Sequence, residues 1–125
     1  MKSRREQRAL IIEELYKLDM NDMQKFTLTE FEFVDEMIQG ILDNLPKIDT
    51  LISEHLERWT LKRVSYVDRA ILRLAVYEMY ATDTPAEIII NEALNLTRTF
   101  TDEGDSKAVS FNNSVLDKIK KTLNK

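Results

Sequence analysis

Apolar residues recur every three or four positions along most of this chain, the spacing that places side chains on one face of an α-helix. In the first such stretch, Ile12, Leu15 and Leu18 belong to the apolar stripe. Polar segments or prolines separate the later stretches, and no convincing strand stands among them. The pattern therefore predicts an all-α fold of six or seven helices, of which six can be delimited: residues 3–20, 29–45, 46–59, 65–81, 85–100 and 109–123.

Residues typical of helix ends lie at several of these boundaries. Thr29 and Glu32 have the spacing of a capping box and predict the start of the second helix. Pro46 ends that helix and suits the first turn of the third. Ser65 and Asp68 are alternative caps for the fourth helix.

The start of the fifth helix is the boundary that the sequence defines least well. Pro85 suits the first turn of a helix, but the three consecutive isoleucines at positions 88–90 also fit an extended segment. We therefore expect this helix to begin between Pro85 and Asn91 and to continue to Phe100. No repeat, low-complexity tract or linker divides the helices, so the sequence predicts one domain over residues 1–125.

Size and composition exclude several classes of protein. The 125 residues are 43% hydrophobic, which suffices for a core without disulfides or metals. Two glycines and two prolines disfavour a β-sandwich or barrel, and the absence of cysteine removes disulfide frameworks and thiol catalysis. No apolar run is long enough to cross a membrane, and the first residues lack the pattern of a signal peptide. A cytoplasmic protein is expected.

The formal net charge of −4 is distributed unevenly along the chain. Residues 1–8 carry +3 and residues 107–125 carry +4, which leaves −11 for residues 9–106. If the two ends lie near each other, they form one basic surface that attracts nucleic acid phosphates. On charge alone, basic tails that serve solubility are the simpler interpretation.

The sequence contains no distinctive catalytic constellation. It lacks a glycine-rich phosphate loop, a nucleophile elbow and the carboxylate–histidine spacing of a di-metal site. His55, the single histidine, is expected to have a structural or surface role. Acid pairs such as Glu13 and Glu14 point about 100° apart on a helix, so they do not face a common substrate. The sequence therefore predicts a protein that is no enzyme and uses no cofactor or metal.

The specific signal comes from several strings in a fixed order. V-D-R-A-I-L-R-L-A-V-Y-E occupies residues 67–78, and it is followed by Pro85, by I-N-E-A at residues 90–93 and by F-N-N-S-V-L-D at residues 111–117. At the other end, a basic N-terminus leads into Leu-Tyr at residues 15–16. Over nearly the whole chain, these strings resemble the NusB family of bacterial transcription antitermination factors.

The resemblance implies a fold of two three-helix halves that binds RNA and has no catalytic activity. The RNA implied is boxA, a short single-stranded element in the leader and spacer of ribosomal RNA transcripts. The implied partners are the ribosomal protein that doubles as NusE and the elongating RNA polymerase complex, where the family suppresses termination and supports ribosomal RNA maturation. Whether the protein forms a homodimer stays an open question, since family members need not agree on oligomeric state.

Single-stranded RNA is read by cations that follow the backbone, by aromatic faces that stack on bases, and by amides or hydroxyls that select base edges. Tyr16 matches a tyrosine at the edge of the family's RNA surface, although a core aromatic on the Ile12 stripe fits its position equally well. By resemblance, the residues expected to contact RNA are Lys2, Arg4, Arg5, Arg8, Tyr16, Asp105, Ser106, Lys107, Phe111 and Asn113.

Two acidic residues are candidates for the surface that binds NusE, because that partner is basic: Glu78 and Glu92. Arg69 and Arg73 are expected to form ion pairs between helices, with acids such as Glu78 or Glu92. A structural role is open for Glu92 as well, because Asn91 and Glu92 suit a helix start.

The chain departs from the family pattern at two places. Glu6 and Gln7 interrupt the basic cluster near the N-terminus, which predicts a weaker contribution to RNA affinity. Asn112 stands where the family has valine and Ser114 where it has glycine, so the turn geometry there is less defined.

Two other functions compete with antitermination. A similar helical domain precedes the catalytic domain of a ribosomal RNA cytosine methyltransferase, but we expect such a chain to continue well past Lys125. A protein-only helical scaffold would need an exposed apolar stripe in place of a basic face. The RNA interpretation predicts that replacing Arg5 and Arg8 together by alanine lowers RNA affinity and leaves stability nearly unchanged.

Overall fold

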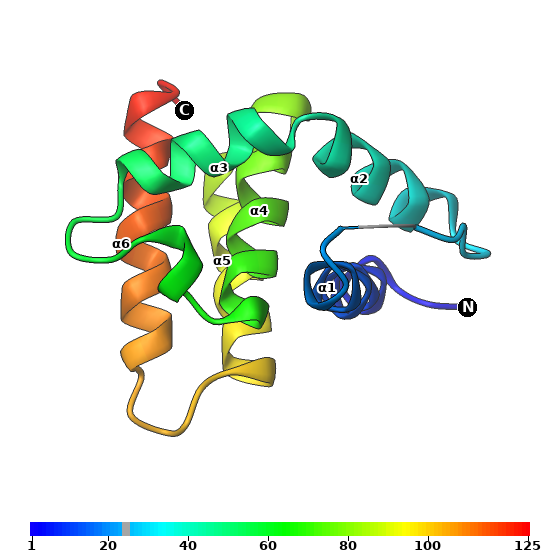
Figure 1. Ribbon diagram of the computed structural model, residues 1–125, viewed down its shortest axis with the longest axis horizontal. Helices are drawn as coiled ribbons and strands as arrows, with labels where there is room; N and C mark the ends of the chain where they lie inside the picture. The colour runs from blue at the N-terminus through cyan, green and yellow to red at the C-terminus, as the bar shows by residue number, and fades with distance from the viewer. Residues whose placement is uncertain (24–25) are drawn as a thin grey trace.

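The computed structural model describes residues 1–23 and 26–125, which form six α-helices and one short 3-10 helix (Figure 1). No strand occurs among these described residues, so the predicted all-α class and number of helices are confirmed. The helices are α1 (Arg4–Met20), α2 (Glu32–Asp43), α3 (Leu45–Glu54), η1 (Leu61–Arg63), α4 (Tyr66–Ala81), α5 (Ala86–Phe100) and α6 (Lys107–Thr122).

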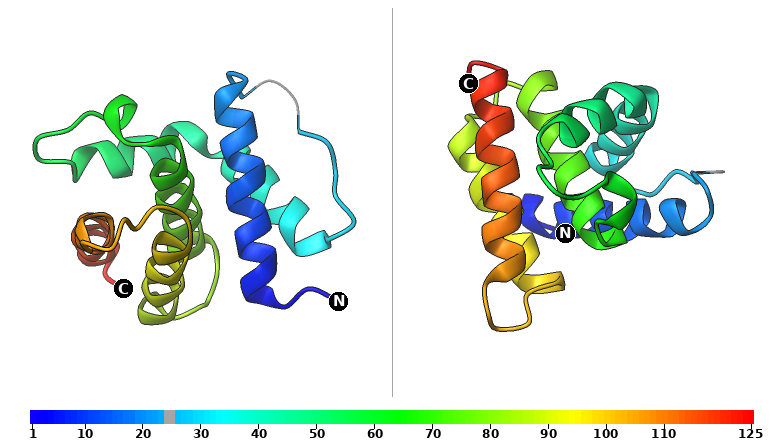
Figure 2. Two further views of the ribbon diagram at one scale, coloured as in Figure 1. Left: turned by 90° about the horizontal axis from the view of Figure 1, so that it is seen from below. Right: turned by 60° about the vertical axis from the view of Figure 1, so that its left-hand side comes forward.

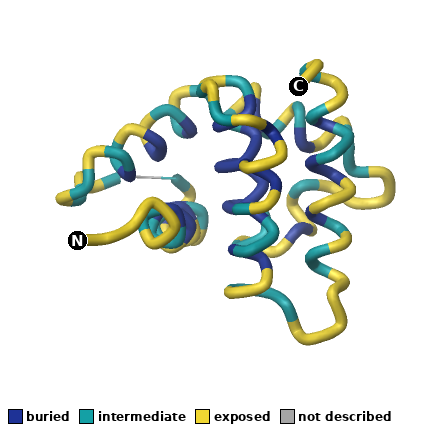
Figure 3. Tube along the Cα trace, turned by 180° about the vertical axis from the view of Figure 1, so that it is seen from behind, coloured by how far each residue is buried: buried dark blue, intermediate teal, exposed yellow. Residues whose placement is uncertain are grey.

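Helix α4 lies at the centre of the molecule, and the other five α-helices all pack against it. Its residues from Ala70 to Val76 are buried without interruption, as expected for a helix that is covered on every side. Helices α5 and α6 complete the C-terminal half, while α1 lies on the opposite side of α4 (Figure 2). Buried residues concentrate along α4 and on the sides of its neighbours that face it (Figure 3).

The fifth helix begins at Ala86, inside the predicted interval, and the three isoleucines are helical. Ile89 and Ile90 are buried against the core, whereas Ile88 is 50% exposed. Full burial of one such side chain contributes about 1.5–3 kcal/mol. Two isoleucines turned inward therefore favour the helix over the extended alternative.

The predicted capping box at Thr29 is wrong. Helix α2 begins at Glu32, and Phe31 stands at its N-cap without a side-chain hydrogen bond. Thr29 instead donates hydrogen bonds from its backbone N–H and its hydroxyl to Asp35 Oδ1, each at 2.8 Å. The threonine therefore holds the connection before α2 and does not cap the helix.

The predicted end of the third helix at Trp59 is also wrong, because α3 ends at Glu54. His55 forms the C-cap, with Nδ1 2.6 Å from the Leu51 carbonyl oxygen and Nε2 2.7 Å from Thr122 Oγ1 on α6. These contacts confirm the structural role expected for His55. From residue 56 onward the chain leaves the helix and passes in front of α6 (Figure 1).

The arginines of α4 form ion pairs between helices, as predicted, but with other partners. Arg69 reaches Asp19 at 3.3 Å, and Arg73 reaches Asp19 at 3.1 Å and Asp49 at 2.9 Å. The expected partners Glu78 and Glu92 lie elsewhere, so that assignment is wrong. Arg73 ties α4 to the end of α1 and to α3, since its guanidinium donates to both carboxylates.

The two chain ends lie on different sides of the molecule (Figure 1, Figure 2). The basic residues of the N-terminus and those at the end of α6 therefore do not form the single basic surface that we expected if the ends were close. No helix within the described residues is both long and apolar enough to span a membrane.

Candidate RNA interface

The start of α1 presents exposed cations on a firmly capped helix end. The Ser3 hydroxyl accepts from the Glu6 N–H at 3.1 Å, and the Glu6 carboxylate accepts from the Ser3 N–H at 2.9 Å, which completes a capping box. Hydrogen bonding from the Ser3 backbone N–H, and then from the Ser3 side chain, lowers the pKa of the Glu6 carboxyl group. The cap offsets the unfavourable placement of arginines near a helix N-terminus. Lys2 and Arg4 are exposed on this end.

Arg4 and Arg5 are held by neighbouring helices while they stay at the surface. The Arg4 guanidinium carbon lies 3.8 Å from the centre of the Phe33 ring on α2. Arg5, whose side chain is 68% exposed, forms an ion pair with Glu92 of α5 at 3.2 Å. The hydrogen bonds that Glu92 accepts raise the pKa of Arg5, so the guanidinium stays charged. Glu92 therefore orients one of the predicted RNA-binding residues.

Arg8 does not share this exposure. Only 11% of its side chain is accessible, and its guanidinium donates to both carboxylate oxygens of Glu78 at 2.8 and 3.1 Å. Glu78 is itself 3% exposed. This geometry does not support contact between Arg8 and RNA, nor between Glu78 and a partner protein, because each side chain already occupies the other inside the core.

Tyr16 lies towards the other end of α1, about 18 Å along the helix from Arg4 at 1.5 Å per residue. It is 38% exposed, and its ring packs edge-on against Tyr66 of α4 with 6.2 Å between centroids. Val67 and Phe100 line the same surface depression. Tyr16 is thus a surface aromatic residue, but most of the length of α1 lies between it and the basic start of the same helix.

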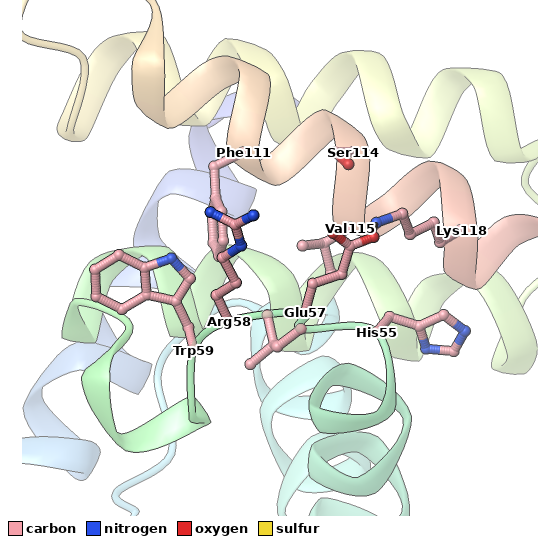
Figure 4. Close-up of a pocket in the computed structure, with 9 residues that line it drawn as sticks. His55, Glu57, Arg58, Trp59, Phe111, Ser114, Val115 and Lys118 are labelled. Carbon is pink, nitrogen blue, oxygen red and sulfur yellow. Dashed lines mark hydrogen bonds and ion pairs between the residues drawn. The ribbon is translucent and has the colours of Figure 1, made fainter.

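The predicted residues near the start of α6 divide between two sides of that helix. Lys107 has 87% of its side chain exposed, and Ser106 precedes it in the left-handed conformation at φ 61°. Phe111 is half-buried beside Trp59 (Figure 4). Asn113 is exposed but lies about 200° around the helix from Phe111, so the two do not face the same ligand.

Asn112, which departs from the family's valine, is fully buried. Its amide donates to Asp68 Oδ1 at 3.2 Å and to Thr97 Oγ1 at 3.0 Å. The Thr101 hydroxyl donates to the same Asp68 oxygen at 3.1 Å. This polar network joins the start of α4, the end of α5 and α6, and it holds these helix ends together beneath the surface that carries Tyr16 and Phe111.

A continuous series of depressions, the aromatic track, runs around the start of α4 from Tyr16 through Tyr66 to Phe111 and Trp59. The depression at Tyr16 shares Ser65 with the next one, which in turn shares Phe111 and Trp59 with the last. The chain between α3 and α4 supplies Trp59, which is 53% exposed.

Four residues of this surface are not among the RNA-binding candidates that the sequence indicates. Part of this set has a signal in the sequence, because the single tryptophan stands beside arginines just after a helix. The four residues are Arg58, Trp59, Arg63 and Tyr66.

Lysines on α6 pair with acids on the elements beside it. Lys118 donates to Glu57 at 2.6 Å, and this hydrogen bond lowers the pKa of Glu57. Lys120 donates to Glu87 at 3.1 Å, and the pKa of Glu87 is lowered first by a hydrogen bond from its own backbone and then by Lys120. These two lysines are less available to a ligand than Lys107.

Within residues 1–23 and 26–125, no cluster of three acidic or histidine side chains is suited to hold a metal ion.

Comparison with known proteins yields relatives along the whole chain. The NusB family model matches residues 2–121. The "Transcription antitermination protein NusB" of Staphylococcus aureus (strain N315) is 38% identical over 132 residues, which cover 95% of this chain and 99% of that protein.

Solved structures of the same kind share the fold. T. maritima NusB matches with a TM-score of 0.81 and 33% identity, over 96% of this chain and 92% of that one. A crystal structure of the antitermination factors NusB and NusE in complex with dsRNA matches with a TM-score of 0.78 and 23% identity, over 95% and 96% of the two chains. These matches and the all-helical architecture agree with the resemblance seen in the sequence, and the chain belongs to the NusB family.

Proposed function

We propose that this protein is a transcription antitermination factor that binds boxA RNA together with NusE and joins the elongating RNA polymerase complex. The observation that carries the proposal is 38% identity, over 95% of the chain, to proteins named for transcription antitermination. A structural neighbour solved with NusE and dsRNA supports NusE and RNA as the classes of partner. The protein acts as a single cytoplasmic RNA-binding domain without catalytic activity.

The described surface supplies the groups that single-stranded RNA requires. Lys2, Arg4 and Arg5 offer positive charge at the start of α1, where backbone phosphates bind. Tyr16 and Phe111 offer aromatic faces at the start of α4 and α6, where bases stack. Because about 18 Å of α1 separates these two groups, the RNA follows α1 from its basic start to the aromatic track.

We therefore propose an RNA interface that keeps most, but not all, of the residues expected from the sequence. Lys2, Arg4, Arg5, Tyr16, Asp105, Ser106, Lys107 and Phe111 stay in the proposed RNA interface. Arg8 and Glu78 are assigned to the core as a buried pair, and the exposed Asn113 lies on another side of α6 than Phe111. Glu92, with 18% of its side chain exposed, contributes by holding Arg5.

The function is tested by fluorescence anisotropy of labelled boxA RNA and of a scrambled RNA, titrated with this protein alone and then with NusE. We expect tighter binding to boxA than to the scrambled RNA, and a further gain when NusE is present. Equal binding of both RNAs with NusE present would contradict the proposal and favour a helical scaffold that binds only protein.

A pair of double variants tests the basic helix start. Lys2→Ala with Arg5→Ala removes two charges from the start of α1, while Lys121→Ala with Lys125→Ala removes two from the end of α6. The first pair should flatten the dependence of log affinity on log salt by about 1.4, because each lost phosphate contact on a single strand changes the slope by about 0.7. An equal effect of the control pair would show that only net charge matters.

A further inference from the structure

Trp59 is the exposed centre of a cleft between the α3–α4 connection and α6. The cleft, which we call the Trp59 cleft, is lined by Arg58, Trp59, Arg63, Lys107, Phe111 and Lys118. Figure 4 shows Trp59, Arg58 and Phe111 at one end and Lys118 with Glu57 nearer to His55. A tryptophan 53% exposed leaves a large aromatic surface in water, where a flat partner can cover it.

The charge around this aromatic surface is positive, in a protein whose net charge is −4. Among the residues that the structure describes, Arg58, Lys62 and Arg63 form no ion pair with a carboxylate. Lys107 reaches Asp105 only at 4.0 Å. Of the cations that line the cleft, three therefore remain available beside the indole ring: Arg58, Arg63 and Lys107.

The acids nearby do not cancel this charge. Asp68 lines the cleft and keeps its negative charge, but its carboxylate accepts hydrogen bonds from Ser65, Thr101 and Asn112 and is outnumbered by the three cations. Glu57 accepts from Lys118, which leaves that pair neutral overall. The open side of the Trp59 cleft thus combines an aromatic face with uncompensated positive charge.

The Trp59 cleft is also continuous with the surface at Tyr16. Its depression shares Ser65 and Asp68 with the one that Tyr16 and Tyr66 line. A strand bound at Tyr16 that continues along the aromatic track therefore arrives at Trp59.

From these observations we infer that the Trp59 cleft binds a nucleotide of single-stranded RNA flanking the element bound at Tyr16. The base stacks on the indole of Trp59, and the adjoining phosphates contact Arg58, Arg63 and Lys107. Stacking on aromatic rings with cations along the backbone is how sequence-tolerant single-strand sites are built. This inference rests on the proposed RNA-binding function, and it adds a subsite beyond it.

The test uses the fact that Trp59 is the only tryptophan in the chain. The protein is labelled with 5-fluorotryptophan, so that a single fluorine resonance reports on the cleft even when unlabelled NusE is present. Two labelled RNAs are compared: boxA alone, and boxA extended by four unpaired nucleotides at each end. Anisotropy of the RNA is followed in parallel.

We expect the extended RNA to bind more tightly than boxA alone and to shift the resonance of Trp59 at the same protein-to-RNA ratios at which anisotropy rises. A rise in anisotropy without a change at Trp59 would overturn the subsite while leaving RNA binding intact. No rise with either RNA in the presence of NusE would overturn the proposed function and the subsite together. A shift caused by NusE without RNA would identify the cleft as a protein-binding surface and overturn the inference.

Variants give an independent readout. Trp59→Ala should lower affinity for the extended RNA by about tenfold, the loss of one stacked base, and lower affinity for boxA alone much less. Trp59→Phe should retain most of the affinity because it keeps an aromatic face. Arg58→Ala with Arg63→Ala should flatten the salt dependence for the extended RNA only, and Lys47→Ala with Lys121→Ala is the charge-matched control. Equal affinity of Trp59→Ala and the wild type for the extended RNA would contradict the inference.

Discussion

Arg5 and Arg8 show how similar residues on one helix take different roles. They lie three positions apart on α1 and both form ion pairs with a glutamate, yet Arg5 is 68% exposed in its side chain and Arg8 only 11%. The sequence presents both as members of one basic cluster. Only the packing of α1 against α4, which places Glu78 beside Arg8, separates a surface cation from a core ion pair.

The buried pair makes a prediction about stability. Arg8→Met or Glu78→Gln should each destabilise the protein by about 3–5 kcal/mol, because the remaining partner loses its compensation in a buried position. Urea unfolding followed by circular dichroism measures this change.

Arg5→Ala is the matched control and should shift the urea midpoint little, since the Arg5 side chain is 68% exposed. The double variant Arg8→Met with Glu78→Leu should recover much of the loss. Unchanged midpoints in both single variants would contradict the buried pair. Because Arg8 is buried, replacing Arg5 and Arg8 together by alanine is expected to destabilise the protein, whereas the sequence alone predicts nearly unchanged stability.

The sequence indicates candidate site residues only where they stand in a motif of the family. Tyr16, Lys107 and Phe111 stand in family motifs, and all three lie at the surface or beside a depression. Trp59 lacks such a motif. Its exposure depends on where α3 ends, and a hydrophobic pattern that continues to Trp59 does not reveal that end.

The helices themselves follow from hydrophobic spacing, because each buries one face against α4 or its neighbours. Their ends follow less reliably. Thr29 and Glu32 have the right spacing for a capping box, but the Thr29 hydroxyl donates its hydrogen bond to Asp35 and does not cap the helix. Ser3 and Glu6 do form a capping box, although the arginines around them are unfavourable near a helix N-terminus and make this helix start hard to recognise in the sequence.

The capping box of α1 links helix stability to RNA binding. Ser3→Ala should weaken the first turn by about 1 kcal/mol, the usual cost of losing such a cap. Because Arg4 and Arg5 lie in that turn, RNA affinity should fall although no charge is lost. Amide hydrogen exchange of Glu6 and RNA anisotropy measure the two effects.

The conservative change Ser3→Thr keeps the capping hydroxyl and serves as control. It should preserve both the protection of the Glu6 amide and the affinity for RNA. Wild-type affinity in Ser3→Ala, alongside faster exchange, would show that the order of this turn does not matter for binding.

In the whole molecule, α4 fixes how the two halves stand relative to each other. The aromatic track draws Tyr16 from the N-terminal half and Phe111 from the C-terminal half, so it exists only when both pack against α4. Hydrophobic spacing predicts the halves but not their relative placement. The sequence therefore leaves open whether the two basic chain ends meet, and in the structure they lie apart (Figure 1).

Ion pairs between elements predict a dependence of stability on pH. The pKa values of Glu57 and Glu87 are lowered from 4.5 in the folded protein. A lowered folded pKa means that the stabilisation is complete above the unfolded value and is lost as pH falls through the folded one. The midpoint of thermal unfolding should therefore decline as pH falls below about 4.5.

Lys118→Met removes the partner of Glu57 and should make this decline shallower. Lys121→Met, whose partner Asp117 lies on the same helix, is the comparison variant. A decline of the same steepness in Lys118→Met and the wild type would show that the Glu57 pair does not contribute.

The proposed function requires that this protein suppress termination through boxA RNA. The most direct measurement is transcription in vitro through a terminator placed downstream of boxA, with polymerase, NusE and the other antitermination proteins present in both arms and this protein added to one. We predict more full-length transcript when it is added, and no gain on a template with scrambled boxA. The same yield with and without the protein on the boxA template would contradict the account.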